Sequence, residues 1–167
     1  ERSLENSPEN LRALATLGAL YVATGKKQQA KGAYEKKHEI NPDIWMAANN
    51  LAYMIAEEAA TDEALDRALK LAERANELAP ERPAVVDSLG WIHYKKGNFD
   101  RAAELIGRAL EQSPESPVLN YHMGMALYKT GKSIEAIEKL QSALNANDAF
   151  DGKDEAERVL KSLQTEG

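Results

Sequence analysis

Apolar residues recur three and four positions apart along short segments of the chain, and these segments come in pairs joined by tight turns. The clearest pair lies between Pro83 and Pro114, with its turn at Lys96-Gly97-Asn98. Residues at this spacing share one face of an α-helix, so the pattern predicts two amphipathic helices. Pro114 ends the second helix because proline cannot continue a helix interior.

Two landmarks of this pair recur along the chain at the same intervals. Prolines lie at positions 8, 42, 80 and 114, and a small residue lies inside the first helix of each pair, at Gly18, Ala52, Gly90 and Gly124. The successive separations are 34, 38 and 34 in both series. A period near 34 built from paired helices predicts an all-α array of helical repeats.

These residues resemble the tetratricopeptide repeat family over nearly the whole chain. In the third repeat the family's landmark positions are held by Val86, Leu89, Gly90, His93, Ala102, Ile106, Ala109 and Pro114. The repeats span residues 11–44, 45–82, 83–116 and 117–150, with Lys37 in place of the usual alanine and Asp148 in place of the usual proline. The resemblance implies a right-handed α-solenoid of helix-turn-helix repeats in a single array.

Three segments depart from the regular period. Residues 1–10 have the form of the end of a preceding second helix, which predicts an excised portion of a longer array. Four residues are inserted between Glu57 and Ala68; with Thr61 or Asp62 as N-cap they predict a longer helix pair with a protruding elbow, and a flexible surface loop is the alternative. Residues 151–167 predict a capping helix, at about 153–164, that covers the apolar end of the last repeat.

The composition is that of an ordinary soluble chain, since 43% of the 167 residues are apolar, 29% are charged and the net charge is −6. The chain has no cysteine, which excludes disulfides and thiolate zinc sites and is compatible with both the periplasm and the cytosol. No apolar run approaches the roughly 18 to 20 residues of a membrane span. The acidic balance argues against a nucleic-acid surface, which needs clustered Lys and Arg.

Residues 49–97 also resemble a pair of repeats common in bacterial tetratricopeptide proteins, among them lipoproteins of envelope secretion and exopolysaccharide systems. This second resemblance implies a role in bacterial envelope assembly or polysaccharide export. It also favours a periplasmic or outer-membrane-associated location over the cytoplasm.

A second set of residues on the first helices, spaced three, four and three apart, points away from the predicted core. In the resembled family this face lines the concave groove, which implies a site for a peptide or helical segment of a partner protein. The predicted groove residues are Met46, Asn49, Asn50, Tyr53, Asp87, Trp91, Tyr94, Lys95, Tyr121, His122, Met125 and Tyr128.

The aromatic members of this set allow two interpretations. Trp and Tyr dominate binding hot spots, but rings at helical spacing also serve as packing between adjacent helices. Both interpretations stay open for Trp91, whereas Tyr94 and Tyr128 favour the groove because their hydroxyls need water or a partner.

Capture of a terminal carboxylate is not predicted for this face. Relatives that grip such a group use lysine, asparagine and arginine at set positions of their first helices. Here the corresponding residues are Ala15, Ala19, Asn50, Ala84 and Ser88, so only the asparagine matches. We expect a partner segment with apolar or aromatic side chains instead.

The candidate catalytic and metal-binding residues form no recognisable motif. The three histidines lack the HExxH spacing of a zinc site. Ser88, Asp87 and His122 lie on predicted helices without a nucleophile elbow or an oxyanion loop. We therefore expect a non-enzymatic scaffold for protein binding, with no cofactor and no metal. The alternative is a structural spacer or a self-assembly module whose open repeat end stacks on another copy.

Overall fold

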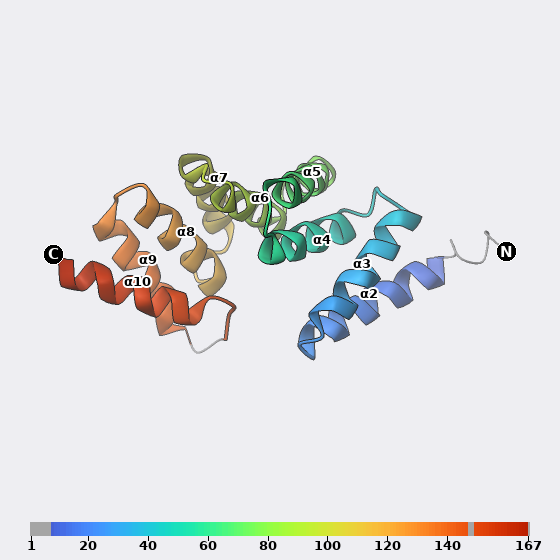
Figure 1. The fold of residues 1–167 in the computed structure, drawn as a ribbon, viewed down its shortest axis with the longest axis horizontal. Coiled ribbons are helices and arrows are strands. Elements are labelled where there is room, and N and C mark those ends of the chain that lie inside the picture. Colours follow the sequence, from blue (N-terminus) through green and yellow to red (C-terminus); the bar gives the residue numbers. More distant parts are fainter. Residues whose placement is uncertain (1–7, 147–148, 167) are drawn as a thin grey trace. The chain divides into compact units, whose positions relative to one another are not determined.

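A computed structural model describes residues 8–146 and 149–166, whose regular structure is entirely helical (Figure 1). The chain divides into two compact units, Glu1–Pro80 and Glu81–Gly167, and each is described by itself. Unit 1 contains α2 (Pro8–Ala23), α3 (Lys27–Ile40), α4 (Trp45–Glu58) and α5 (Asp62–Leu78). Unit 2 contains α6 (Pro83–Lys95), α7 (Phe99–Gln112), α8 (Pro117–Lys129), α9 (Ser133–Asn145) and α10 (Lys153–Glu166). None of the described helices is both long and apolar enough to cross a membrane.

The helices pack as antiparallel pairs, and within each unit one pair packs on the next along the chain. Within the pairs, α2 lies on α3, α4 on α5, α6 on α7 and α8 on α9. Inside unit 1 the second helix α3 also packs on α4, and inside unit 2 α7 packs on α8 and α9 on α10. Such nearest-neighbour packing is the organisation of a helical repeat array. The predicted all-α repeat fold is confirmed.

Three of the turns inside the pairs share one backbone solution. Gly25, Gly97 and Gly131 have φ values of 70°, 81° and 77°, in the left-handed region where a Cβ atom is costly. The residue after each glycine donates its N–H to a carbonyl five residues earlier, with N···O distances of 2.8, 2.9 and 3.0 Å. These bonds satisfy carbonyl groups at the end of the first helix and fix where the second helix begins.

The recurring small residue marks where the two helices of a pair approach most closely. A Cβ atom added to Gly90 would lie 2.8 Å from Cγ1 of Ile106, and one added to Gly124 would lie 2.7 Å from Cγ of Leu140. Ala52 is fully buried at the corresponding place in α4. The period found in the sequence is therefore the period of these close approaches.

The four inserted residues lengthen the second helix of their repeat. Helix α5 has 17 residues, compared with 14 in α7 and 13 in α9. It begins after Thr61, whose side-chain oxygen accepts a hydrogen bond from the N–H of Ala64 at 3.3 Å. The prediction of a longer helix with an N-cap at this position is confirmed over the alternative of a flexible loop.

The start of the chain differs from its prediction. Residues 8–10 belong to α2 and not to the tail of a preceding second helix, so that part of the prediction is wrong. Proline is readily accommodated at the first helical position, because its missing N–H would have no partner inside the helix. Residues 1–7, and Asp148 in place of the repeat proline, lie outside the described residues.

Lys37 takes a place inside the packing that the family usually gives to alanine. The residue is only 6% exposed, and its burial lowers the pKa of the ammonium group because a charged group loses hydration there. A lysine can occupy such a place because its long aliphatic stem packs while its head group reaches toward water.

Helix α10 occupies the position of the first helix of a further repeat. It differs from the first helices before it on the face that packs on the second helix in a complete repeat. In α8, which packs on α9, that face carries Asn120, Met123, Gly124 and Leu127, and Gly124 lies against Leu140. The residues 34 positions later are Asp154, Glu157, Arg158 and Lys161, and all four are exposed. Helix α10 buries Ala156 and Leu163 on its other side. Its charged outer face suits water, as expected of a capping helix.

The close approach at Gly90 generates a stability prediction. Gly90→Ala forces its new methyl group against Ile106 and is expected to destabilise unit 2 by about 1 to 3 kcal/mol. The matched change Gly107→Ala on α7 meets no atom within 4 Å and is expected to stabilise the helix by about 0.5 to 1 kcal/mol. Urea unfolding followed by circular dichroism measures both. Equal effects of the two changes would contradict the packing role of Gly90.

Candidate partner-binding site

Helices α6 and α8 of unit 2 place the predicted aromatic residues next to one another. Both helices begin with a proline at the first helical position, Pro83 and Pro117, and they approach each other directly. Because their sequences are in register one repeat apart, side chains at equivalent positions lie side by side. We call the side chains of Trp91, Tyr94, Tyr121, His122 and Tyr128 the aromatic wall.

Trp91 lies at the centre of the aromatic wall and is only 3% exposed. Its ring stacks on Tyr94, with centroids 4.5 Å apart and planes 2° apart, and on His122, with centroids 4.0 Å apart and planes 15° apart. Tyr121 packs against it at 5.5 Å with a tilt of 52°. Trp91 therefore acts as packing between α6 and α8 in this structure, and it holds the rings around it in fixed orientations.

Asp87 and His122 form a buried hydrogen-bonded contact beside the rings. The two carboxylate oxygens of Asp87 lie 2.8 and 3.0 Å from Nδ1 of His122, whose side chain is 1% exposed. An ionised carboxylate can only accept, so Nδ1–H donates. This contact ties α6 to α8 and fixes the plane of the imidazole on which Trp91 stacks.

Tyr121 connects the aromatic wall to the last helix. Its hydroxyl donates to Oε2 of Glu155 at 2.8 Å, and its ring packs against Phe150 with centroids 5.4 Å apart. Gly152, with φ 97°, passes so close to the ring that a Cβ atom there would overlap it. Helix α10 and the segment before it thus support the aromatic wall through their contacts with Tyr121.

Tyr94 and Tyr128 form a half-buried layer that borders the surface. Burial raises the pKa of Tyr94 to about 12, with smaller contributions from the negative charge of Glu155 and from Tyr128. The hydroxyl of Tyr94 is thus a neutral donor at physiological pH. The ammonium groups of Lys95 and Lys129 lie 5.5 Å from the Trp91 ring centroid and 5.6 Å from that of Tyr128, which are cation–π distances.

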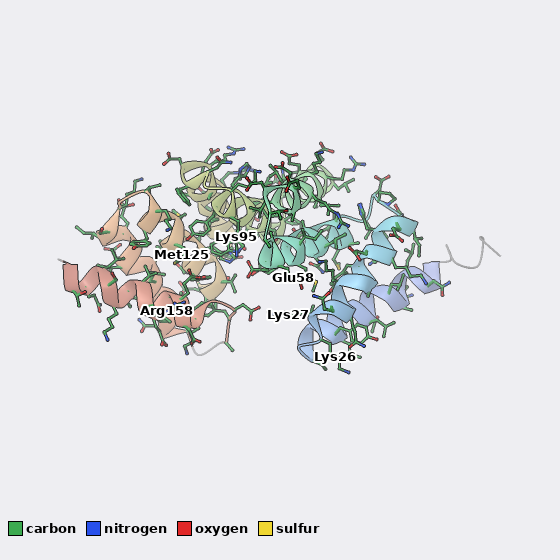
Figure 2. The ribbon with its side chains drawn as sticks, viewed as in Figure 1. Lys26, Lys27, Glu58, Lys95, Met125 and Arg158 are labelled. Atoms are coloured by element: carbon green, nitrogen blue, oxygen red, sulfur yellow. The ribbon has the colours of Figure 1, made fainter. Side chains whose placement is uncertain are left out.

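The remaining predicted groove residues lie elsewhere. Met125 is on α8 and is 2% exposed; Figure 2 labels it together with Lys95 of α6 and Arg158 of α10. Met46, Asn49, Asn50 and Tyr53 lie on α4 in unit 1. Met46 is 42% exposed, Asn49 is 6% exposed, and Asn50 and Tyr53 are half-buried. The predicted set therefore divides into a cluster in unit 2 and a smaller group in unit 1.

Sequence reasoning missed the residues that support the aromatic wall from outside the first helices. Glu155 and Gly152 lie at or just before the start of α10, and Phe99 begins α7, where its ring packs on Tyr94 with centroids 5.4 Å apart. The sequence did contain a signal for Glu155. Asp87, Tyr121 and Glu155 follow one another at intervals of 34 residues, the length of one repeat. Extending the repeat register into the capping helix would have found it.

The geometry gives no arrangement for catalysis at these residues. Ser88 donates its hydroxyl to the carbonyl of Ala84 at 2.9 Å, a local bond common for serine inside helices. It therefore does not extend the Asp87–His122 contact into a triad. Within the described residues, no group of three or more His, Asp or Glu side chains could hold a metal ion.

Sequence comparisons relate this chain to repeat proteins. Residues 88–152, which include the whole aromatic wall, match the family model described as Tetratricopeptide repeat. A protein of Pseudomonas aeruginosa named TPR repeat-containing protein PA4667 is 31% identical over 97 residues, which are 58% of this chain. The match spans only 16% of the length of that relative.

Comparisons with solved structures agree on the fold. TTC0263, a thermophilic TPR protein of Thermus thermophilus, matches 96% of this chain and 86% of its own with a TM-score of 0.72 at 19% identity. A chain of the APC/C hetero-tetramer Cut9–Hcn1 matches 93% of this chain over 30% of its own length, with a TM-score of 0.77 at 19% identity. YrrB, described as a TPR protein with an unusual peptide-binding site, matches 89% of this chain and 73% of its own, with a TM-score of 0.61 at 17% identity.

The contact between Gly152 and Tyr121 generates a second stability prediction. Gly152→Ala puts a Cβ atom into the tyrosine ring and is also strained at positive φ, so we expect a loss of about 2 to 4 kcal/mol. The matched change Gly97→Ala has a similar φ but open space around it, and we expect a loss of about 1 to 2 kcal/mol. Chemical denaturation followed by tryptophan fluorescence compares the two. A loss no larger for Gly152→Ala than for Gly97→Ala would show that the ring contact does not hold the cap.

Proposed function

We propose that this chain, whose residues 88–152 match the tetratricopeptide repeat model, is a protein-interaction scaffold and that unit 2 binds a peptide or helical segment of a partner on its aromatic wall. The partner contacts the half-buried layer, Tyr94 and Tyr128 with Lys95. The buried members Asp87, Trp91, Tyr121, His122 and Met125 serve this site by holding that layer in place.

The observation that carries the proposal is the two-layer arrangement of the aromatic wall. A buried layer of stacked rings fixes Tyr94 from below, with 2° between its plane and that of Trp91. Binding loses less entropy when the contacting side chains are already ordered. Tyrosine also offers a large apolar ring with a polar end, the combination that is enriched at binding hot spots.

Unit 1 offers a smaller surface of the same kind on α4. Met46 is exposed and Tyr53 is half-buried beside Asn50, and the side-chain amide of Asn49 lies 3.5 Å from Oδ1 of Asn50. Methionine adapts its shape to varied partners because it is unbranched and polarisable. We propose that these residues give unit 1 a contact surface of its own for a protein segment, weaker than the aromatic wall of unit 2.

The proposal is tested by selecting ligands for the intact chain from a random-peptide phage library. The double variant Tyr94→Ala, Tyr128→Ala is expected to lose about tenfold or more in affinity for the selected peptides, because truncated hot-spot residues typically cost about 2 kcal/mol or more. Ile134→Ala removes a side chain that is 77% exposed on α9 and is the matched control. Helicity of both variants is checked by circular dichroism. Peptides that bind the double variant and the control equally would place the site elsewhere.

A second candidate function is self-association through α2. Leu20 of this helix is 54% exposed. Leu119 and Ala126, at the positions equivalent to Ala13 and Leu20, are buried on α8, which packs on α7. The face of α2 is therefore built like one covered by another helix. The charged outer face of α10 is not complementary to it, so a second copy would meet it in a symmetric α2-to-α2 contact.

Light scattering over a range of concentrations tests this second candidate. A dimer that dissociates on dilution, and that is lost in Leu20→Gln but kept in Ile134→Gln, is the expected result, because an apolar contact cannot tolerate a buried amide without a partner. A monomer at every concentration would exclude the contact. A role in envelope assembly or polysaccharide export, with the corresponding location, stays a prediction from the sequence.

A further inference from the structure

We propose that the segment bound by unit 2 is acidic, with two carboxylate side chains about three residues apart that pair with Lys95 and Lys129 while apolar side chains contact Tyr94 and Tyr128. This inference rests on the proposed function and adds the chemistry of the partner. The carboxylates are side chains of the partner, and they would bind at the ends of α6 and α8. Relatives that grip a terminal carboxylate do so at a different place.

A tyrosine-lysine dipeptide recurs in register at the ends of α6 and α8. Tyr94-Lys95 and Tyr128-Lys129 end the last turns of α6 and α8, one repeat apart. The equivalent residues are Ala56 and Glu57 on α4, and Val22 and Ala23 on α2. The repeat fold therefore does not require a tyrosine and a lysine here, and their recurrence is particular to unit 2.

The two lysines are held by the aromatic wall. Their ammonium groups lie over the Trp91 and Tyr128 rings at 5.5 and 5.6 Å. Lysines in a last helical turn also interact favourably with the carbonyl groups at the helix end, but that interaction alone does not place them over rings. A cation held by an aromatic face loses less side-chain entropy when it pairs with a carboxylate.

The charge around these lysines also favours an acidic partner. The chain as a whole has a net charge of −6, yet the two turns that follow α6 and α8 add Lys96 and Lys132 to the pair. A local cationic surface on an acidic protein attracts anionic segments and repels cationic ones. The carboxylate of Glu155 accepts a hydrogen bond from Tyr121, so this acidic group is engaged inside the aromatic wall.

A mainly polar hollow beside Lys129 supplies room for a partner side chain next to the carboxylates, with Phe99 as its apolar contact. It has a volume of about 710 Å³, and its lining includes Phe99 and Lys129 together with Arg101 and one carboxylate, Asp100. Phe99 packs on Tyr94 with ring centroids 5.4 Å apart, so the hollow and the aromatic wall share a border. A partner that pairs with Lys129 can therefore place a neighbouring apolar side chain against Phe99.

The spacing follows from the packing of the helices. Helices in direct contact have axes roughly 8 to 10 Å apart. A segment in the polyproline II conformation advances about 9 Å in three residues and returns side chains i and i+3 to the same face. Two carboxylates three residues apart on such a segment therefore match lysines at equivalent positions of α6 and α8.

The test uses three rhodamine-labelled peptides and the intact chain, with binding measured by fluorescence polarisation. The first is Gly-Ser-Leu-Glu-Pro-Leu-Glu-Pro-Leu-Ser-Gly, in which proline favours the polyproline II conformation. The second replaces both glutamates by glutamine, and the third, Gly-Ser-Leu-Pro-Glu-Glu-Leu-Pro-Leu-Ser-Gly, has the same composition with adjacent carboxylates. We expect the first to bind about tenfold more tightly than the second, from two exposed charge pairs, and more tightly than the third.

Variants assign the effect to the two lysines. The double variant Lys95→Gln, Lys129→Gln is expected to bind the glutamate and glutamine peptides equally. The single variant Lys129→Gln is expected to keep half of the preference, measured as the logarithm of the ratio of the two affinities. Lys161→Gln removes the same charge from the exposed outer face of α10 and is expected to keep the preference. Raised salt should weaken the first peptide more than the second, because ions screen exposed charge pairs.

Two results would overturn the inference. The first is equal binding of the glutamate and glutamine peptides to the unchanged chain, and the second is a glutamate preference that survives Lys95→Gln with Lys129→Gln. In either case the proposed function is judged separately, by the phage-selected peptides and the variant Tyr94→Ala, Tyr128→Ala. Selected peptides that depend on the two tyrosines but lack acidic residues would overturn the acidic partner and leave the aromatic wall as the binding site.

Discussion

The structure depends on the close approach of the two helices within each repeat. A short amphipathic helix cannot bury its apolar face alone, and most helical stability in proteins comes from such burial. Gly90 and Gly124 let the paired helices approach until Ile106 and Leu140 fill the space where a Cβ atom would be. With the pairs fixed in this way, the opposite sides of α6 and α8 come next to each other in a constant register.

That register creates the aromatic wall. Residues 34 positions apart become neighbours, so the carboxylate of Asp87 meets the imidazole of His122, 35 residues later, at 2.8 Å. Trp91 then stacks between Tyr94 and His122. The aromatic wall is a consequence of repeat packing, and the ordered half-buried layer on top of it is what makes unit 2 suited to bind a partner segment.

Helices α2 and α10, the first and last of the described helices, differ in the face that is not covered by another helix. Helix α10 follows the register of a first helix but carries Asp154, Glu157, Arg158 and Lys161 where α8 packs on its second helix. Charged residues on this face cannot be buried without large desolvation costs, so α10 covers α9 on one side and faces water on the other. Helix α2 instead keeps Leu20 more than half exposed, and for that reason a second copy is proposed to bind there.

The sequence by itself determined the repeat, its period and the helix pairs, because these follow from local spacing, turn residues and the small residue at each close approach. It narrowed the N-cap of α5 to Thr61 or Asp62, and the structure decided for Thr61. The sequence also placed Tyr94 and Tyr128 on the first helices, on the side away from the paired helix. Only the tertiary structure decided that Trp91, Tyr121, His122 and Met125 are buried and that Glu155 and Gly152 support the aromatic wall. Whether a side chain is buried depends on how closely the neighbouring helices approach. That separation is set jointly by all the side chains at the contact, so it cannot be read from any single position of the sequence.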